Sequence, residues 1–528
     1  MLRTFAFNSS LHPSSRLKNR FFAIALTLLF SSANTFAESA SSSDTASQGK
    51  SFNQNTVREL AQALAKKPYE ALPQAPKGLT SLDYSTYRKI NYRQDAAIWG
   101  HSPAKFSVQL FAPGSLFKEL VDINVIESGK SYPVDVSESS FHTPDPEIAK
   151  LIAEVGKYAG MRLHYPINQP DYNDEFVVFQ GASYFRAVSK GQVYGLSSRG
   201  LAINVAKPQG EEYPVFKRFW IERPSRHQKA IVVHALLDSE SITGAYRFGI
   251  YPGSPTRIDV AAVLYPRVDL EHVGLAPLTS MFMHGPLDPP DKRDYRPAVH
   301  DSEALAIIQG NGEQIWRPLA NPHSLQVSGF TDENPKGFGL IQRHRNFDYY
   351  QDLEAKYHAR PSAWVEPLND WGKGQVELVE IPSGSEANDN IVAYWQPEGG
   401  LKKDQPYSFS YQLTWPDDLK SDDEQSRIVR SAGGQKIFDE HNNSEVIIDY
   451  SNLSAEQIKD INVNASINKG KIIEAHLEAN PGTKGARVFV TFDPESADVA
   501  ELRIQLTRDE KPVAATWLYR WVSEDWAQ

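Results

Sequence analysis

The feature that most constrains this chain is a strand-like alternation of apolar and polar residues, which recurs over more than 300 residues with few helical patterns between the runs. The runs are rich in β-branched and aromatic residues and are bounded by Gly, Pro, Asp or Ser, which favour turns. The clearest runs before the C-terminal part cover residues 106–111, 230–236, 246–251, 256–263, 375–381 and 407–413. Consecutive strands without intervening helices favour antiparallel sandwiches over a βαβ architecture. We therefore predict an all-β protein.

Two segments have a helical period instead. In residues 56–71, apolar side chains recur at the spacing i, i+3, i+4 and i+7, and Thr56 and Glu59 match a capping box. In residues 145–158, the same spacing places Ile148 and Ile152 on one face. We predict a helix over each segment.

A charged, polar stretch at residues 416–425 interrupts the strand pattern and begins with proline. We interpret it as a linker between a large β-sandwich domain (55–415) and a smaller C-terminal domain (426–528). The smaller domain contains alternating runs at 486–492, 501–507 and 513–519. Their length and spacing are typical of an immunoglobulin-like β-sandwich, here without a disulfide.

The N-terminal 37 residues differ from the rest of the chain. Four basic residues without any acidic one precede a ten-residue apolar run, 21–30, and small and polar residues follow up to Ala37. This pattern predicts a cleaved secretory signal peptide over 1–37 and an exported protein. The apolar run is half the ~20 residues that span a bilayer, which disfavours a membrane anchor. Residues 38–54 are polar and low in complexity, and we expect a flexible leader there.

Composition excludes several classes of function. The chain has a net charge of −10, which argues against broad electrostatic binding of nucleic acid, and we expect no nucleic-acid partner. It contains no cysteine, so disulfides, thiolate zinc sites and cysteine nucleophiles are excluded.

The common catalytic and nucleotide-binding signatures are missing from the sequence. His344, between Arg343 and Arg345, indicates a polar loop rather than a metal site, and we expect neither a metal nor a cofactor. An enzyme remains open, because glycosidases need only two carboxylates and a cleft.

Aromatic and acidic residues are concentrated between residues 295 and 396, and the tryptophans include Trp316, Trp371 and Trp395. Sugar rings stack on flat aromatic side chains, while carboxylates and amides bind sugar hydroxyls. Any single aromatic residue here is better explained as part of a sandwich core. Their clustering with Asp301 and Asp389 favours a carbohydrate cleft.

Longer motifs in the same part of the chain resemble the periplasmic glucan biosynthesis family of OpgG and OpgD, also called MdoG and MdoD. The resemblance is strong over about residues 55–415 and weak in the C-terminal domain, and the absence of a twin-arginine signal resembles the OpgG branch. It is carried by Gly181-Ala-Ser-Tyr-Phe-Arg186, Phe219-Trp-Ile-Glu-Arg-Pro224, His300-Asp-Ser302, Trp316-Arg-Pro318, Arg360-Pro-Ser-Ala-Trp364, Trp371-Gly-Lys-Gly374 and Asn388-Asp-Asn-Ile-Val-Ala-Tyr-Trp395.

The resemblance implies a large β-sandwich joined to an immunoglobulin-like one, in agreement with the pattern of strands. It also implies a role in making osmoregulated periplasmic glucans, whose backbone is β-1,2-linked glucose, and members are similar to inverting endo-β-1,2-glucanases. By the same resemblance, the general acid falls on Asp389, the general base on Asp301 and a substrate-contacting tyrosine on Tyr357.

Two functions remain from different classes. One is an inverting endo-β-1,2-glucanase that trims the nascent glucan, with Trp316, Trp371 and Trp395 as additional sugar platforms. The other is a non-catalytic glucan-binding protein that guides the nascent chain or docks the inner-membrane glucan synthase. Retention of both carboxylates favours the enzyme. The sequence leaves open whether the synthase is a partner and whether the protein forms a homodimer.

Overall fold

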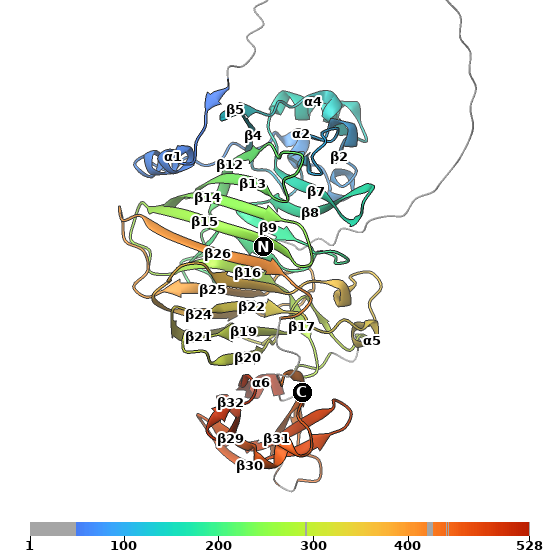
Figure 1. Ribbon diagram of the computed structural model, residues 1–528, viewed down its shortest axis with the longest axis vertical. Coiled ribbons are helices and arrows are strands. Elements are labelled where there is room, and N and C mark those ends of the chain that lie inside the picture. Colours follow the sequence, from blue (N-terminus) through green and yellow to red (C-terminus); the bar gives the residue numbers. More distant parts are fainter. Residues whose placement is uncertain (1–48, 291–292, 420–425, 440, 442, 527–528) are drawn as a thin grey trace, which may run out of the picture.

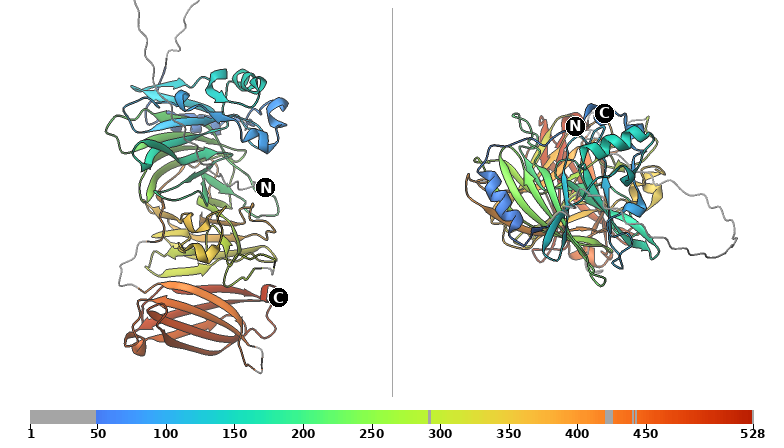
Figure 2. Two further views of the ribbon diagram at one scale, coloured as in Figure 1. Left: turned by 90° about the vertical axis from the view of Figure 1, so that its right-hand side faces the viewer. Right: turned by 90° about the horizontal axis from the view of Figure 1, so that it is seen from above.

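The computed structural model describes residues 49–290, 293–419, 426–439, 441 and 443–526. The predicted signal peptide and most of the predicted leader lie outside these residues, as do residues 420–425 of the predicted linker. Figures 1 and 2 show an elongated molecule, in which a large stack of strands stands on a smaller β-domain formed by the C-terminal residues. Strands dominate the described residues, so the predicted all-β class is confirmed.

One layer of the large domain belongs to a sheet of 16 strands. Within the large domain its order is β1 (Lys50–Ser51), β5 (Lys130–Pro133), β4 (Asp122–Glu127), β12 (Val215–Glu222), β13 (Ile231–Asp238), β14 (Ile242–Tyr251), β15 (Thr256–Pro266), β26 (Tyr407–Trp415), β23 (Ala363–Pro367), β22 (Gly337–Ile341), β19 (Ala304–Ile308) and β20 (Gln314–Pro318). The predicted runs at 230–236, 246–251, 256–263 and 407–413 all lie in this layer.

The facing layer is a sheet of ten strands. Its order is β21 (Gln326–Glu333), β24 (Lys373–Glu380), β25 (Ile391–Pro397), β16 (Val273–Ser280), β10 (Ser197–Arg199), β9 (Tyr184–Ala187), β8 (Tyr172–Gln180), β7 (Gly160–Gln169) and β3 (Ser107–Phe111), and β11 (Leu201–Ile203) pairs with β16. The two layers meet in one large core. Phe179 and Phe185 from this sheet pack against Phe248 of β14, with ring centroids 5.2 and 5.3 Å apart.

The described C-terminal residues form a second, smaller sandwich. One sheet has the order β27 (Ile428–Gln435), β28 (Ser444–Ser451), β31 (Gly485–Asp493), β30 (Lys471–Asn480), and the other β34 (Thr516–Val522), β32 (Val499–Arg508), β29 (Asn462–Ile467), with the short β33 (Lys511–Pro512) beside β32. In chain order these are strands 1-2-5-4 facing 3-6-7, the arrangement of a constant-type immunoglobulin domain. Buried Tyr450, Val488 and Trp517 fill the space between them.

The two domains are joined by more than a linker. β34 of the small domain pairs in parallel with β20 of the large one, with Ile315 opposite Thr516 and Trp316 opposite Trp517. Beside this pairing, the Glu313 carboxylate accepts hydrogen bonds from Arg503 at 2.6 Å and from the Thr516 hydroxyl at 2.8 Å. The 16-stranded sheet therefore continues from one domain into the other.

Both predicted helices are present but shorter than predicted. Helix α1 (Thr56–Ala65) begins after Asn55, and the Thr56 hydroxyl accepts from the backbone N–H of Asn53, so the predicted capping box with Glu59 is wrong. The helix ends where Pro68 disfavours a helical conformation for the residue before it. Helix α4 (Pro146–Val155) ends at Gly156, which adopts φ 64°.

Helix α1 covers the outer face of the large sheet, where Val57 and Ala61 pack on Trp220 and Leu236. The described end of the predicted leader is also ordered, because Lys50 and Ser51 form β1 against β5.

The remaining elements are short and lie in loops. They are α2 (Lys77–Thr80), α3 (Tyr84–Tyr87), α5 (Phe347–Tyr350), α6 (Ser523–Trp526), the 3₁₀ turns η1 (Gln94–Ala96), η2 (Glu138–Ser140), η3 (Tyr357–Ala359) and η4 (Gln457–Asp460), and the strand pairs β2 (Asn91–Tyr92) with β6 (Phe141–His142) and β17 (Phe282–His284) with β18 (Val299–His300). Within the described residues, no helix is long and apolar enough to cross a membrane.

Candidate functional site

Asp301 lies at one end of the large sandwich, immediately after β18. Its backbone N–H donates to the carbonyl of Met281 at 2.7 Å, just before the paired strand β17. The side chain is completely buried. A carboxylate in such a position needs a compensating charge or hydrogen bonds.

Asp389 is held next to the same stretch of backbone by its neighbour Asn390. The Asn390 amide accepts from the N–H of Phe282 at 2.8 Å and donates to the Phe282 carbonyl at 2.9 Å. Met281 and Phe282 are adjacent, so one short segment anchors both the Asp301 and the Asp389 loops. Asp389 itself is half-buried. The structure thus brings together the two carboxylates that the sequence singles out.

Arg360 supplies the charge that Asp301 needs. Its guanidinium forms a buried ion pair with Asp301 Oδ1, and its Nε donates to the Ala355 carbonyl at 3.0 Å. Burial raises the pKa of the Asp301 carboxyl and the negative charge of Asp389 raises it further, while Arg360 opposes both effects. Oδ2 of Asp301 is buried and has no hydrogen-bond partner among the described residues.

Tyr357 packs between this ion pair and Glu386. The Arg360 guanidinium lies 4.5 Å from the centre of the Tyr357 ring, and the Tyr357 hydroxyl donates to Glu386 Oε2 at 2.8 Å. Burial raises the pKa of Tyr357, and the nearby charges of Asp301 and Glu386 also raise it. The phenol is therefore neutral at physiological pH and acts as a hydrogen-bond donor.

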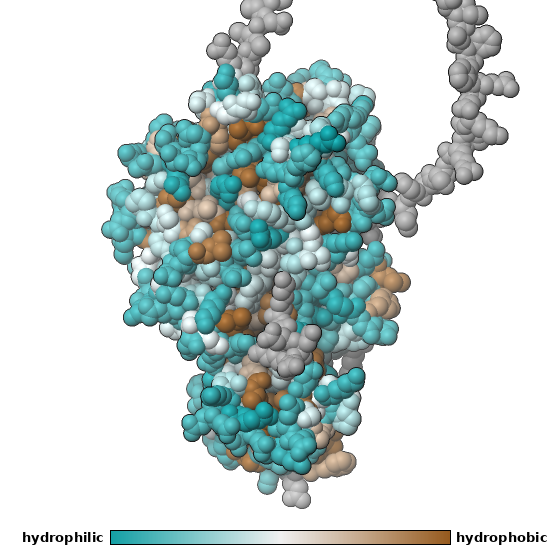
Figure 3. Space-filling view, viewed as in Figure 1, coloured by the Kyte–Doolittle hydropathy of each residue, from teal (hydrophilic) through white to brown (hydrophobic). Residues whose placement is uncertain are grey.

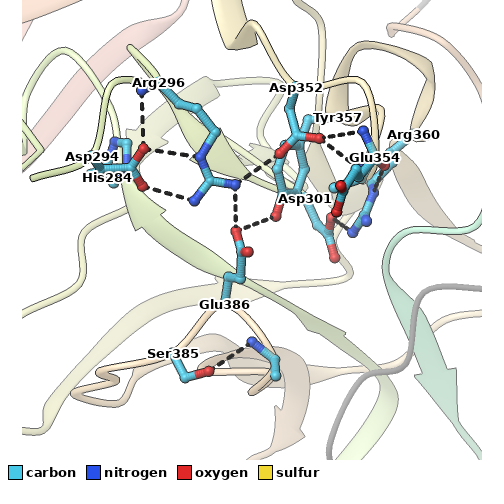
Figure 4. A network of polar contacts seen from close by, with 12 residues as sticks. His284, Asp294, Arg296, Asp301, Asp352, Glu354, Tyr357, Arg360, Ser385 and Glu386 are labelled. Atoms are coloured by element: carbon cyan, nitrogen blue, oxygen red, sulfur yellow. Dashed lines mark hydrogen bonds and ion pairs between the residues drawn. The ribbon is translucent and has the colours of Figure 1, made fainter.

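Arg296 fixes the other side of Glu386. Its guanidinium donates to Glu386 and Asp352, both at 2.8 Å, and to the two carboxylate oxygens of Asp294 at 3.0 and 2.8 Å. Hydrogen bonds from Arg296 hold the pKa of Asp294 well below its usual range. Figure 4 shows that this network and the Asp301–Arg360 pair lie side by side, with Tyr357 between them. Glu386, with its side chain 43% exposed, connects the network to solvent.

Tyr184 of β9 lies on the Asp389 side of the site. Burial raises the pKa of its hydroxyl, and the charge of Asp389 contributes to that shift. Tyr184 lines a cavity of about 290 Å³ together with Tyr213 and Phe117. The Arg199 guanidinium lies 4.9 Å from the Tyr184 ring and 5.6 Å from the Tyr213 ring, which fixes both rings at the edge of the cavity.

The three predicted tryptophan platforms do not join this site. Trp395 has no exposed surface and Trp371 is 4% exposed, and both lie in the sandwich core with ring centroids 6.2 Å apart. Other side chains cover them, so we remove them from the candidate sugar-binding residues. Trp316 lies on the outer face of the large sheet, with the Arg343 guanidinium 4.2 Å from its ring.

The sequence did not indicate the role of the two arginines. Arg360 belongs to the motif Arg360-Pro-Ser-Ala-Trp364, which carries the family resemblance without naming a function. The rule that a buried carboxylate needs a cation could have suggested an arginine, but not which one. Arg296 lies in Tyr295-Arg-Pro297, which likewise resembles the family without naming a function. Within the described ranges, no cluster of three or more His, Asp or Glu residues could hold a metal ion.

Comparison with known proteins identifies the family of this chain. The model of the family described as "Periplasmic glucan biosynthesis protein, MdoG" matches residues 52–521. The chain is 63% identical to glucans biosynthesis protein G 2 of Shewanella oneidensis, covering 91% of this chain and 90% of the relative. It is 46% identical to glucans biosynthesis protein G of Vibrio cholerae, covering 89% and 87%.

Similarity to solved structures is much weaker. A GH36 α-galactosidase from Geobacillus stearothermophilus aligns with a TM-score of 0.23 and 8% identity, covering 49% of this chain and 39% of the enzyme. That level of similarity supports no conclusion about function. The family match, by contrast, covers both sandwiches and both aspartates, and the chain therefore belongs to the MdoG family of periplasmic glucan biosynthesis proteins.

Proposed function

We propose that this protein is an inverting endo-β-1,2-glucanase that shortens glucan chains during periplasmic glucan biosynthesis, with Asp389 as general acid and Asp301 as general base. An inverting glycosidase protonates the leaving oxygen with one carboxyl group and activates water on the opposite face of the sugar with another. The observation that carries the proposal is the anchoring of both aspartate loops to Met281 and Phe282.

The environment of Asp301 suits a general base. A raised pKa makes a carboxylate a better proton acceptor, while the Arg360 ion pair keeps it ionised until the reaction. Oδ1 pairs with Arg360, so Oδ2 is the oxygen that receives the proton. A buried carboxylate paired with arginine can therefore serve as the base without direct contact with solvent.

The complete burial of Asp301 means that a proton from the attacking water reaches it through an intervening group. The Tyr357 hydroxyl is the candidate, because it donates to the partly exposed Glu386 and the charge of Asp301 raises its pKa. In such a relay the hydroxyl would turn from Glu386 to Asp301 Oδ2, give its proton to that oxygen and take one from the attacking water. With such a relay, the carboxyl groups of Asp301 and Asp389 can lie farther apart than the ~5–5.5 Å of a retaining pair.

Asp389 is accessible to substrate, as an acid at a leaving oxygen must be. The cavity that Tyr184 lines offers aromatic and polar side chains, the combination that binds sugar rings, and Tyr184 connects it to Asp389, whose charge acts on the Tyr184 hydroxyl. A β-1,2-glucan is the polymer that family membership and these side chains together favour.

The proposal is tested by incubating the protein with linear β-1,2-glucan. We expect shorter oligosaccharides, with the α-anomer as the first product by NMR because hydrolysis inverts the β-linkage. Asp389→Asn removes the proton donor but keeps its shape, so it should abolish cleavage and leave thermal unfolding nearly unchanged. Asp370→Asn is the matched control, since Asp370 is exposed on another loop. Cleavage at the wild-type rate by the Asp389 variant would refute the assigned mechanism.

The alternative is a non-catalytic protein that guides the glucan or docks the synthase. Wild-type protein that binds the glucan without shortening it would favour this alternative over the glucanase. A β-anomeric first product would instead keep the enzyme and reject inversion.

We also propose that the protein is exported by the general secretory route and cleaved after Ala37. The family is described as periplasmic, and the basic residues, apolar run and small residues of positions 1–37 support the same location. N-terminal sequencing of periplasmic material should begin at or near Glu38. An intact Met1 on the periplasmic product would exclude cleavage.

A further inference from the structure

A second concave surface lies where the two domains meet, on the outer face of the large sheet. The cavity there has a volume of about 1050 Å³ and is lined by strands β15, β26, β23, β19 and β20 and by residues 426–429, 451, 452 and 515 of the small domain. We call it the interdomain groove. Its volume lies at the upper end of the ~300–1,000 Å³ of small-molecule sites, so it can hold several sugar units. It does not include Asp301, Asp389 or Tyr357.

Trp364 forms a flat floor in this groove. A Cβ atom added to Gly337 would overlap the Trp364 ring, and one added to Gly339 would lie 2.9 Å from that ring. The two glycines of β22 therefore let the indole lie directly over the neighbouring strand. One ring face covers bare backbone, and the half-buried indole lines the cavity. A wide ring supported in this way offers a stacking surface for the apolar face of a sugar.

Two further aromatic rings border the groove, and each is held by an arginine. The Arg257 guanidinium lies 4.0 Å from the centre of the Tyr251 ring, and Arg343 lies 4.2 Å from that of Trp316. Cation–π contacts at these distances fix the rings and leave guanidinium edges as hydrogen-bond donors. The predicted platform Trp316 thus belongs to this groove rather than to the aspartate site.

The charges of the lining favour an uncharged ligand. Arg257 pairs with Asp259 at 3.3 Å, Arg343 with Glu303 at 2.9 Å and Arg427 with Asp418 at 3.0 Å. Each of these arginines is already neutralised by a carboxylate, so an anionic ligand gains little attraction. Glu366 and Gln412 add polar groups next to Trp364.

The walls are fixed relative to one another by the pairing of β20 with β34 and by the Glu313 contacts to Arg503 and Thr516. The groove therefore needs no domain closure to form. Outside its grey atoms, Figure 3 shows this side of the molecule as mainly hydrophilic, with apolar side chains in small separate patches. Such a surface suits a polyhydroxylated chain better than a broad apolar partner.

We propose that the interdomain groove is a second glucan-binding site, which holds a stretch of the same uncharged glucan outside the aspartate site by stacking on Trp364. The identity of the ligand rests on the function proposed above. The existence of the site rests on the lining of the groove and on the position of Trp364. Holding the chain at a second place raises the effective concentration of the polymer at the first site.

The experiment measures binding of linear β-1,2-glucooligosaccharides to the Asp389→Asn variant by isothermal titration calorimetry. We expect two classes of site. Adding Trp364→Ala should weaken one class about tenfold and leave the other unchanged. Gln412→Ala keeps the indole in place and should weaken the same class of site. This second variant tests the groove even if the tryptophan variant is unstable. Tyr172→Ala is the matched aromatic control, because Tyr172 is 56% exposed and lies outside the groove lining.

The outcomes separate this inference from the proposed function. Cleavage by the wild-type protein together with a single class of site, or with two classes that neither groove variant changes, would overturn the second site and leave the glucanase standing. Two classes of site without any cleavage by the wild-type protein would keep the groove and reject the glucanase. No binding of the glucan at all would overturn both.

Discussion

At the scale of single residues, the site depends on how a carboxylate is kept inside a β-sandwich. Asp301 is fully buried, and Arg360 is the cation that compensates it. Removing one partner of a buried ion pair leaves the other charge buried without compensation. The resulting loss of stability is much larger than the net stabilisation that the intact pair provides.

We predict that Arg360→Met destabilises the protein by about 3–5 kcal/mol. The methionine keeps much of the apolar stem that packs on Tyr357 but removes the guanidinium. Urea unfolding at pH 7 measures the change, with the exposed Arg226→Met as control. A loss below about 1 kcal/mol would indicate that Asp301 is protonated in the native protein, since a neutral carboxyl group needs no cation.

Tyr357→Phe separates the ring of this residue from its hydroxyl. The phenyl ring still packs under Arg360, and Glu386 keeps its hydrogen bond from Arg296, so the loss of stability should be about 1 kcal/mol. If the hydroxyl carries the proton to Asp301, kcat for β-1,2-glucan should fall by at least about 100-fold with little change in KM. An unchanged kcat would exclude the hydroxyl from the proton path.

The tryptophans mark the limit of what single residues reveal in a sequence. Trp371, Trp395 and Trp316 come from similar aromatic motifs and all three are buried, but two lie in the core of the large sandwich and Trp316 lies in the apolar cluster shared with the small domain. The face to which a side chain points depends on strand register and on which sheets pack together. Asp301 and Asp389 were singled out together because motif resemblance names both, and their loops do share an anchor at Met281 and Phe282, while their catalytic roles stay a proposal.

At the scale of elements, the local sequence pattern predicted where strands lie, but not which strands pair with each other in the sheets. The predicted runs at 106–111, 375–381 and 486–492 correspond to β3, β24 and β31. The pairing of β15 with β26 joins residues about 150 positions apart, and no local signal predicts it. All eight residues of β16 are buried, so this strand has no alternation to read.

Close packing between strands β22 and β23 gives an element-scale prediction. A Cβ added to Gly339 would meet the backbone carbonyl of Ala363 and lie 2.9 Å from the Trp364 ring. Gly339→Ala should therefore destabilise the protein by about 1–3 kcal/mol, measured by urea unfolding. Gly384→Ala is the matched control, because nothing lies within 4 Å of a Cβ there. Equal stability of the two variants would mean that β22 can shift away from β23.

At the scale of the whole molecule, the sequence predicted a large β-sandwich and a smaller immunoglobulin-like one, but not the strand pairing that joins them. Residues 416–425 read as a linker because they are polar and charged. The parallel pairing of β20 with β34 depends on two strands about 200 positions apart, each of which looks like an ordinary strand. Composition therefore indicates where the chain passes from one domain to the other, but not which contacts join the two domains.

Asp288 gives a pH-dependent prediction near this joint. Burial raises the pKa of Asp288 from 3.8 to about 6, and the charge of Asp525 in the small domain raises it further, against a backbone hydrogen bond from Asn321. A carboxyl group whose pKa is raised by folding binds more protons in the native state, so stability falls as pH rises from about 4 to about 6.

Asp288→Asn should remove most of that fall, because the amide stays neutral and still accepts from Asn321. At pH 7 the variant should be more stable by up to about 3 kcal/mol, from a pKa difference of about 2 units, and equal to the wild type below pH 4. Urea unfolding between pH 4 and 8 measures the difference, with the exposed Asp404→Asn as control. Parallel curves for wild type and variant would show that Asp288 does not titrate in this range.

The last strand of the small domain also has a protective effect on the large one. In the sheet, β20 pairs with β19 along one edge and with β34 along the other. A chain shortened before β34 would present that side as a bare sheet edge, able to recruit strands from other molecules. The immunoglobulin-like domain therefore acts as an end cap, and its removal should make the remaining protein self-associate through β20.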